Sequence, residues 1–155
     1  MSSSSNKSSD RDKKTVRVVV AEDYGGLSKI LRRVIDEAPD MTCSGCFNNG
    51  RELLESLEKL RPDVISLDLS MPEMNGFAVL KQLRKTAPDV RCIVFSGFAE
   101  EDYVRGALAA GAEGYVFKED FGEFTQGITE VAAGCRYLSS RFEGMRDLPD
   151  HSLGE

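Results

Sequence analysis

The stretch VISLDLSMPEMNG, residues 64–76, decides the fold that we expect for the whole chain. An apolar run rich in β-branched residues ends on a single carboxylate, Asp68, and a tight connection containing Pro72 and Asn75-Gly76 leads into a helix. Such a run is typical of a buried strand, which would hold Asp68 at the carboxyl edge of a sheet, where open α/β sheets bind ligands. Asp also begins ordinary turns, so the rest of the chain must distinguish the two interpretations.

The pattern of strand, turn and helix recurs along the chain. Apolar runs typical of strands occur at residues 16–20, 41–47, 64–69, 90–95 and 114–117. Each is followed by apolar residues at helical spacing. Five alternations predict a parallel sheet with helices on both faces, and the nearly continuous apolar strands agree, because such strands are buried on both sides. We therefore predict an α/β fold of three layers, α/β/α, with five parallel strands in the order 2-1-3-4-5.

Polar side chains stand at four of the five predicted strand ends. They are Glu22 and Asp23 after the first strand, Asp68 after the third, Ser96 after the fourth and Lys118 after the fifth. With the predicted order, the first and third strands flank the point where the connections reverse, so a site belongs there. Each residue alone is more often a solvated strand end, a loop start or a surface lysine, but their joint placement favours a site.

The chemistry of this cluster is restricted. Three neighbouring carboxylates repel one another, so either a pKa rises or a cation binds. Oxygen ligands without His or thiolate favour Mg²⁺, which keeps several waters and takes only a few carboxylates. A carboxylate nucleophile, an ammonium group and a hydroxyl donor are the parts that phosphoryl transfer requires.

Composition restricts the class of protein. The length of 155 residues suits one domain, and a net charge of -6 with a pI near 4.9 argues against a nucleic-acid-binding surface. The sequence has neither a signal-peptide-like start nor an apolar run long enough to span a bilayer, which favours the cytoplasm over a membrane. We expect a Ser-rich disordered leader over residues 1–14, a folded domain over 15–140 and a flexible polar tail over 141–155.

Two of the four cysteines, Cys43 and Cys46, have the spacing of a redox or metal pair. The sequence contains no second pair to complete a zinc site, and its one histidine, His151, lies in the tail. Residues three apart in a strand also point to opposite faces. We therefore interpret these cysteines as buried or loop thiols.

From about Val16 to Ser140 the chain resembles the receiver domain of two-component response regulators, which has a flavodoxin-like, CheY-like fold. The matching marks are the acidic pair at 22–23, the block at 68–76, Ser96 and the sequence YVFK at 115–118. The segments AAGAEGY at 109–115 and AGCRYLS at 133–139 look most like receivers that carry a LuxR-type DNA-binding domain. The block DLSMPEMNG is quite specific for this family, and the whole set of motifs in this order is strongly specific for it.

The resemblance implies a phosphoacceptor site with Mg²⁺ as its cofactor. Asp68 would accept a phosphoryl group from a phosphohistidine on a sensor histidine kinase or a histidine phosphotransfer protein. Asp23 would bind the metal directly with help from Glu22, and Asp68 and the backbone carbonyl of Ser70 would complete the protein ligands. The protein would then be a signalling module with weak self-phosphorylation and dephosphorylation rather than a metabolic enzyme.

The resemblance also implies a switch. Lys118 would pair with the phosphoryl oxygens, Ser96 would move to hydrogen-bond them, and Tyr115 would change rotamer with it. The surface of the fourth helix, fifth strand and fifth helix would then control a partner, homodimerisation or a DNA-binding output domain outside this chain. A stand-alone receiver and an excerpt of a longer regulator both fit the sequence, and Met1 with the leader favours a natural start.

Some positions depart from the family pattern. Glu119 follows Lys118, where many members have a proline, so the isomer of that peptide bond is left open. The loop Tyr24-Gly25-Gly26 is unusual after the acidic pair and bears on access to the site. Ser70 and Phe98 stand where the family tunes the lifetime of the phosphoryl group.

Three alternatives stay open. The first is a receiver-like module whose interactions do not depend on phosphorylation, against which the intact set of site residues argues. The second is a phosphohydrolase with Asp68 as nucleophile, but such enzymes commonly carry a second Asp where this chain has Ser70. The third is a flavodoxin-like flavin binder, which lacks the expected Ser/Thr-rich phosphate cradle after the first strand.

Overall fold

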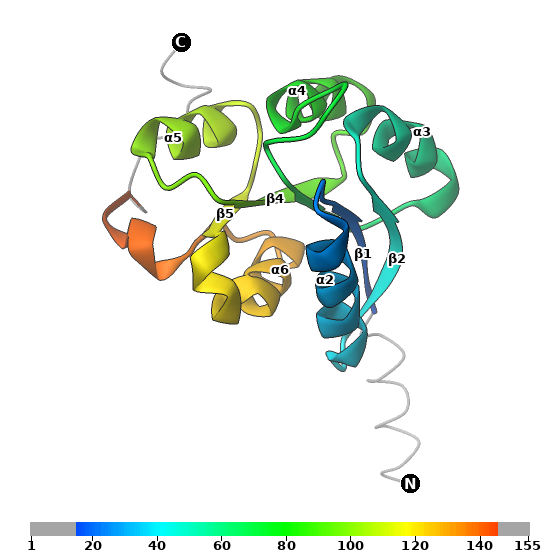
Figure 1. The fold of residues 1–155 in the computed structure, drawn as a ribbon, viewed down its shortest axis with the longest axis horizontal. Coiled ribbons are helices and arrows are strands. Elements are labelled where there is room, and N and C mark those ends of the chain that lie inside the picture. The colour runs from blue at the N-terminus through cyan, green and yellow to red at the C-terminus, as the bar shows by residue number, and fades with distance from the viewer. Residues whose placement is uncertain (1–14, 146–155) are drawn as a thin grey trace, which may run out of the picture.

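A computed structural model describes residues 15–145, and strands and helices alternate along this part of the chain. The elements, labelled as in Figure 1, are β1 (Val16–Ala21), α2 (Gly25–Glu37), β2 (Met41–Phe47), α3 (Gly50–Leu60), β3 (Val64–Leu67), α4 (Gly76–Thr86), β4 (Arg91–Ser96), α5 (Glu101–Ala109), β5 (Gly114–Phe117), η1 (Lys118–Glu123), α6 (Phe124–Ala132), β6 (Tyr137–Leu138) and η2 (Ser140–Met145). No helix within residues 15–145 combines the length and the apolar character needed to cross a bilayer.

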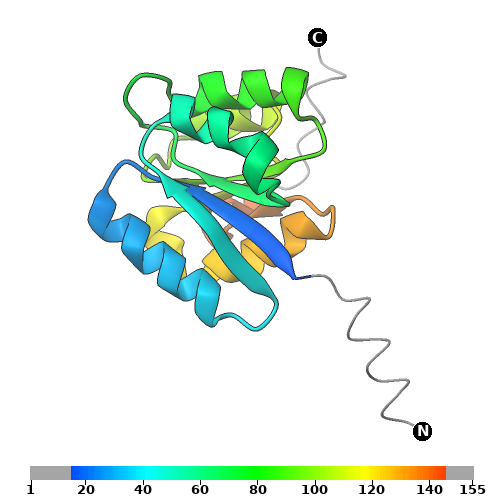
Figure 2. The ribbon, with the colours of Figure 1, turned by 90° about the vertical axis from the view of Figure 1, so that its right-hand side faces the viewer.

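The strands form one parallel sheet in the order β2-β1-β3-β4-β5-β6. Helices α3, α4 and α5 cover one face, and α2 and α6 cover the other (Figures 1 and 2). The predicted three-layer fold is confirmed, together with the order of its first five strands. The connections reverse between β1 and β3, so the carboxyl ends of these two strands flank the crevice where a ligand site is expected.

Two apolar cores, one on each face, hold the sheet between its helices. Leu53, Leu80 and Val104 come from α3, α4 and α5 and belong to the first core. Leu31 from α2 and Ile128 from α6 belong to the second. All five side chains are at most 1% exposed. Strands buried on both faces place their carboxyl ends at fixed positions, and this rigidity determines where the polar residues meet.

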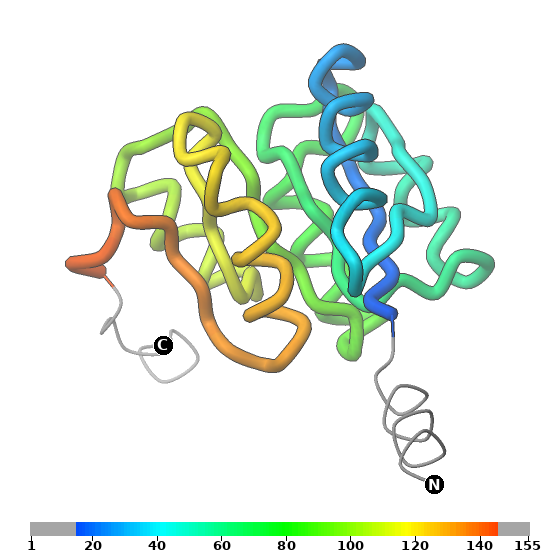
Figure 3. Tube along the Cα trace, turned by 90° about the horizontal axis from the view of Figure 1, so that it is seen from below, coloured from blue at the N-terminus to red at the C-terminus, as the bar shows by residue number. Residues whose placement is uncertain are grey.

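A sixth strand and the segment after it differ from the prediction. Tyr137 and Leu138 of β6 pair in parallel with Gly114 and Tyr115 of β5. A two-residue strand is too short to give a periodic signal. The chain then continues through η2, and Figure 3 shows the β6–η2 segment beyond α6 at the edge of the molecule.

The folded part extends five residues beyond the boundary predicted at Ser140. Phe142 and Met145 are only 3% and 5% exposed and pack in the same core as Tyr115. Their burial explains why residues 141–145, which we assigned to a flexible tail, are ordered onto the sheet: two apolar side chains in a polar stretch cover the end of β5. The predicted leader 1–14 and the rest of the predicted tail, 146–155, lie outside the described residues.

The first residue of α4, directly after the connection from β3, needs to be glycine. The Asn75 side chain caps α4 by accepting a hydrogen bond from the Ala78 N–H at 3.0 Å. A Cβ atom on Gly76 would lie 2.7 Å from the Leu69 Cα and 2.8 Å from the Asp68 carbonyl oxygen. Because both contacts are with backbone, a side chain at this position would displace the segment that carries Asp68.

We predict that Gly76→Ala lowers the free energy of unfolding by about 2–3 kcal/mol, the usual cost of overpacking against a rigid neighbour. Chemical denaturation in urea measures the change. The matched control is Gly25→Ala, since Gly25 also begins a helix, α2, and has open space around the added Cβ. Equal stability of the two variants would show that the contact of Gly76 with the backbone does not constrain the loop.

Candidate functional site

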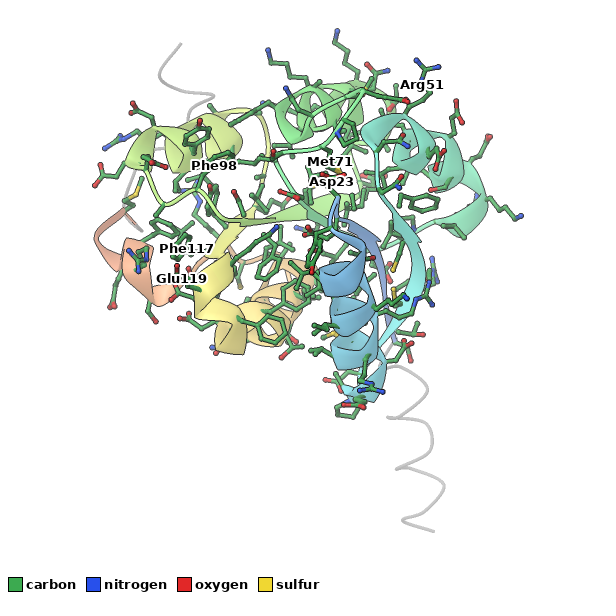
Figure 4. All side chains as sticks on the ribbon, viewed as in Figure 1. Asp23, Arg51, Met71, Phe98, Phe117 and Glu119 are labelled. Carbon is green, nitrogen blue, oxygen red and sulfur yellow. The ribbon has the colours of Figure 1, made fainter. Side chains whose placement is uncertain are left out.

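The strand ends bring five of the seven predicted site residues to one cavity, whereas Ser96 and Tyr115 are not in its lining. It has a volume of about 320 Å³ and is lined by Glu22, Asp23, Tyr24, Asp68, Ser70, Gly97, Phe98 and Lys118. Glu22 and Asp68 are buried at its base, whereas Asp23 is exposed. Figure 4 shows Asp23 where β1 leads into α2, and Phe98 in the connection from β4 to α5. Ser96, the last residue of β4, is fully buried.

Lys118 lies between the two buried carboxylates. Its Nζ atom lies 3.1 Å from Oε2 of Glu22 and 3.5 Å from Oδ2 of Asp68. Glu22 also accepts a hydrogen bond from the Tyr24 N–H at 3.2 Å. Burial and the nearby charge of Asp68 nevertheless raise the pKa of Glu22 to about 7, against the opposing effect of Lys118. One cation is therefore insufficient for this acidic cluster.

Glu22 gives the metal-free protein a distinctive pH dependence. Its folded pKa of about 7 lies above the ordinary value of 4.5, so its contribution to stability is complete below pH 4.5 and is lost as the pH rises through 7. We predict that Glu22→Gln, which mimics the protonated acid, raises the Tm at pH 8 in a chelator by a few degrees. The gain should vanish near pH 4.5.

The matched control for this prediction is Glu119→Gln, which neutralises an exposed acid at the same edge of the sheet. Thermal unfolding followed by circular dichroism at pH 4.5, 6 and 8 measures both variants. A pH-independent Tm difference for Glu22→Gln would contradict the raised pKa.

The donor atoms around the cavity are those that a hard cation prefers. The carboxylates of Asp23 and Asp68 and the nearby backbone of Ser70 supply oxygen, without nitrogen or sulfur ligands in the cavity lining. The Ser70 N–H donates to Oδ1 of Asp68 at 3.1 Å, which fixes the orientation of that carboxylate. Within residues 15–145, no three His, Cys, Asp or Glu side chains form a ready-made metal cluster. The donor set therefore fits Mg²⁺, which completes its octahedron with water, better than a cation that needs many protein ligands.

The two predicted switch residues meet at Phe98. The Ser96 hydroxyl accepts a hydrogen bond from the Phe98 N–H at 3.0 Å, and the Tyr115 hydroxyl donates to the Phe98 carbonyl at 2.8 Å. The Phe98 ring stacks on Tyr103 of α5 with centroids 4.2 Å apart. Burial raises the pKa of Tyr115 to about 12, so its hydroxyl remains a donor.

The sequence marked Phe98 and the loop at Tyr24 without giving their contacts, and it did not mark Phe142. Phe98 connects the two switch residues. Its place two residues after Ser96 drew attention to it, but no spacing rule reveals the connection. Tyr24 lines the cavity and is 69% exposed at its mouth. Phe142 meets Tyr115 edge-on with ring centroids 5.3 Å apart, and its position in the predicted tail concealed this contact. The peptide bond after Lys118, which the sequence left open, is trans.

Comparison with known proteins identifies the family. The model of the response regulator receiver domain matches residues 18–129. The chain belongs to this family. This receiver domain is therefore a module of two-component signalling, as its strand-end residues indicated.

The receiver domain has curated relatives of different lengths. It is 37% identical over 123 residues to the nitrate/nitrite response regulator protein NarL of Escherichia coli strain K12, an alignment that covers 79% of this chain and 57% of NarL. It is 33% identical over 102 residues to the chemotaxis protein CheY of Thermotoga maritima, covering 66% of this chain and 84% of CheY. The chain thus spans little more than half the length of NarL.

Solved structures share the fold. The response regulator domain of Thermotoga maritima CheB is 31% identical with a TM-score of 0.70, over 79% of this chain and 97% of that one. A LuxR-family two-component response regulator from Aurantimonas sp. SI85-9A1 is 23% identical with a TM-score of 0.81, over 91% of this chain and 98% of that one. Both agree with the three-layer arrangement of the receiver domain described above.

Proposed function

We propose that this receiver accepts a phosphoryl group on Asp68 and, once phosphorylated, switches the surface formed by α5, β5 and α6. The observation that carries the proposal is the position of Lys118 between Glu22 and Asp68 in a cavity open to solvent. An oriented carboxylate beside a fixed ammonium group is the arrangement that phosphoryl transfer requires.

In the proposed step, an Oδ atom of Asp68 attacks the phosphorus of a phosphohistidine. The new P–O bond forms as the P–N bond breaks, and the imidazole leaves with its electron pair and takes a proton from solvent. Lys118 stays beside Asp68 and pairs with the transferred phosphoryl oxygens. Mg²⁺, held by Asp23, Asp68 and the Ser70 carbonyl with help from Glu22, would neutralise charge on the same oxygens.

The switch follows from the hydrogen bonds of Ser96. Its hydroxyl is held by the Phe98 N–H, and moving it toward a phosphoryl group on Asp68 would break this bond. The freed loop would release the Phe98 carbonyl from the Tyr115 hydroxyl, and the Phe98–Tyr103 stack would transmit the change to α5. A local change of charge would thereby bias a two-state surface.

The proposed partners are a sensor histidine kinase or a histidine phosphotransfer protein, acting in the cytoplasm, with homodimerisation on activation. Output would pass to a protein partner or to a DNA-binding domain outside this chain. The net charge of -6 supports the view that this chain itself does not bind nucleic acid. We propose a signalling role over a phosphohydrolase, because Ser70 cannot serve as the second acid. We propose it over a phosphorylation-independent module, because the acidic residues and Lys118 line one cavity.

The test is intact mass after incubation with an acyl phosphate and Mg²⁺, followed by borohydride reduction and peptide mapping. The expected result is one added phosphoryl group located at residue 68, absent when a chelator replaces Mg²⁺. No addition under these conditions, or an addition located elsewhere, would overturn the proposal.

Metal binding gives a separate prediction. We expect Asp23→Asn to weaken Mg²⁺ binding at least about tenfold, since it removes the one exposed carboxylate that reaches the cavity. Titration calorimetry measures the affinity. The control is Asp102→Asn, which alters an exposed acid on α5 away from the cavity. Unchanged Mg²⁺ affinity in Asp23→Asn would show that the metal binds elsewhere.

A further inference from the structure

An irregularity in β2 brings Cys43 and Cys46 to the same face of the sheet. Cys43 pairs with Val18 and Gly45 pairs with Val19, so Ser44 is an extra residue in the ladder. We expected residues three apart in a regular strand to point to opposite faces, and the bulge reverses this expectation. Both cysteines pack with the core that lies under α2, and their sulfur atoms are 3.8 Å apart.

The two thiols have different surroundings. Cys43 is buried and Cys46 is half-buried, so Cys46 is the sulfur that a solute can reach. The hydrogen bond with Cys43, together with Ser28 and Arg32 of α2, lowers the pKa of Cys46 to about 6. Hydrogen bonding with Cys46 and burial raise the pKa of Cys43. A partly exposed thiolate beside a cation is the environment of a reactive cysteine.

We propose that Cys43 and Cys46 form a redox-active dithiol that a hydroperoxide oxidises to a disulfide. The Cys46 thiolate attacks a peroxide oxygen, and an S–O bond forms as the O–O bond breaks. The departing alkoxide, or hydroxide from hydrogen peroxide, takes a proton from solvent. The Cys43 sulfur then attacks the Cys46 sulfenic acid, giving up its proton as the S–O bond breaks and water leaves. Two thiols lose two electrons in total, and the peroxide gains them.

The two sulfur atoms lie within van der Waals contact of each other. The two sulfurs must approach from 3.8 Å to about 2.05 Å, and the thiols are close enough for Cys43 to resolve the sulfenic acid without a partner protein. Disulfide formation would remove the thiolate that faces Arg32, changing the charge on the exposed side of α2. This chemistry uses no residue of the phosphoacceptor site.

The chain supplies its own controls. Cys92 is buried, and burial raises its pKa to about 12, while Cys135 is exposed without a second cysteine beside it. Trypsin places the cysteines of the three environments on different peptides. Cys43 and Cys46 share peptide 34–51, Cys92 lies in peptide 92–105, and Cys135 lies in peptide 119–136. Cys135→Ser is used as background to prevent disulfides between molecules.

The experiment treats the full chain with hydrogen peroxide and follows each peptide by mass. The expected result is loss of two hydrogens from peptide 34–51, at least about tenfold faster than any oxidation at Cys92. Cys43→Ser should stop at a sulfenic acid on Cys46 that dimedone traps, whereas Cys46→Ser should leave Cys43 reduced. Circular dichroism checks that both serine variants fold.

Two outcomes would overturn the proposal. One is a peptide 34–51 that keeps both thiols free under conditions that oxidise Cys135 in the unmodified chain. The other is dimedone labelling of Cys43 in place of Cys46. Asp68→Asn should oxidise at the same rate as the unmodified chain, which separates this proposal from the phosphoacceptor function.

Discussion

Asp68→Asn is expected to abolish labelling by an acyl phosphate completely. The amide nitrogen is not a nucleophile at neutral pH. Within residues 15–145, the other buried carboxylate that contacts Lys118 and lines the cavity is Glu22. Glu22 is only 2% exposed, and it accepts a hydrogen bond from the Tyr24 N–H. Asn keeps an oxygen that can accept the Ser70 N–H, so the loop geometry should survive. Intact mass measures the loss.

The matched control is Asp63→Asn at the opposite end of β3. Asp63 accepts a hydrogen bond from the Arg17 N–H at 2.8 Å, and Asn can keep it, so this variant should label normally. In a chelator, Asp68→Asn should be at least as stable as the unmodified protein, because it relieves the repulsion that helps to raise the pKa of Glu22. Residual labelling of Asp68→Asn would move the acceptor to another residue.

The sequence was sufficient for the features that depend on regular pattern. Apolar strands followed by amphipathic helices determine a parallel sheet, and the parallel sheet brings the strand ends together, so Glu22 and Asp68 could be placed in one site before the structure was known. The position of Lys118 follows from the same argument, because β5 ends directly before it.

Features that depend on local irregularity could not be predicted in this way. The bulge at Ser44 adds one residue and thereby reverses the side on which Cys46 lies. The strand β6 contains two residues, and the burial of Phe142 depends on a long-range contact with Tyr115 that no local pattern records. Phe98 connects Ser96 and Tyr115 through its backbone N–H and carbonyl. Because every residue has these groups, the sequence does not indicate the connection.

Lys118→Met should have the second large effect, on both activity and stability. Met retains much of the apolar stem but removes the ammonium group that lies 3.1 Å from Glu22 and 3.5 Å from Asp68. Loss of one charge-stabilising donor typically slows such transfers by about 10²–10³-fold, so we expect labelling to slow by at least about 100-fold. The rate of mass gain under saturating acyl phosphate and Mg²⁺ measures this.

The stability of Lys118→Met distinguishes a structural role from an electrostatic one. Because two buried carboxylates lose their cation, the free energy of unfolding should fall by about 2–4 kcal/mol at pH 8 in a chelator, near the range for broken buried ion pairs. The cost should shrink at pH 5, where Glu22, whose pKa is already raised to about 7, binds a proton. Lys81→Met, on the exposed side of α4, is the matched control and should change neither property. An equal loss of stability at both pH values would mean that Lys118 acts by packing. Normal labelling of Lys118→Met would show that another group neutralises the phosphoryl charge.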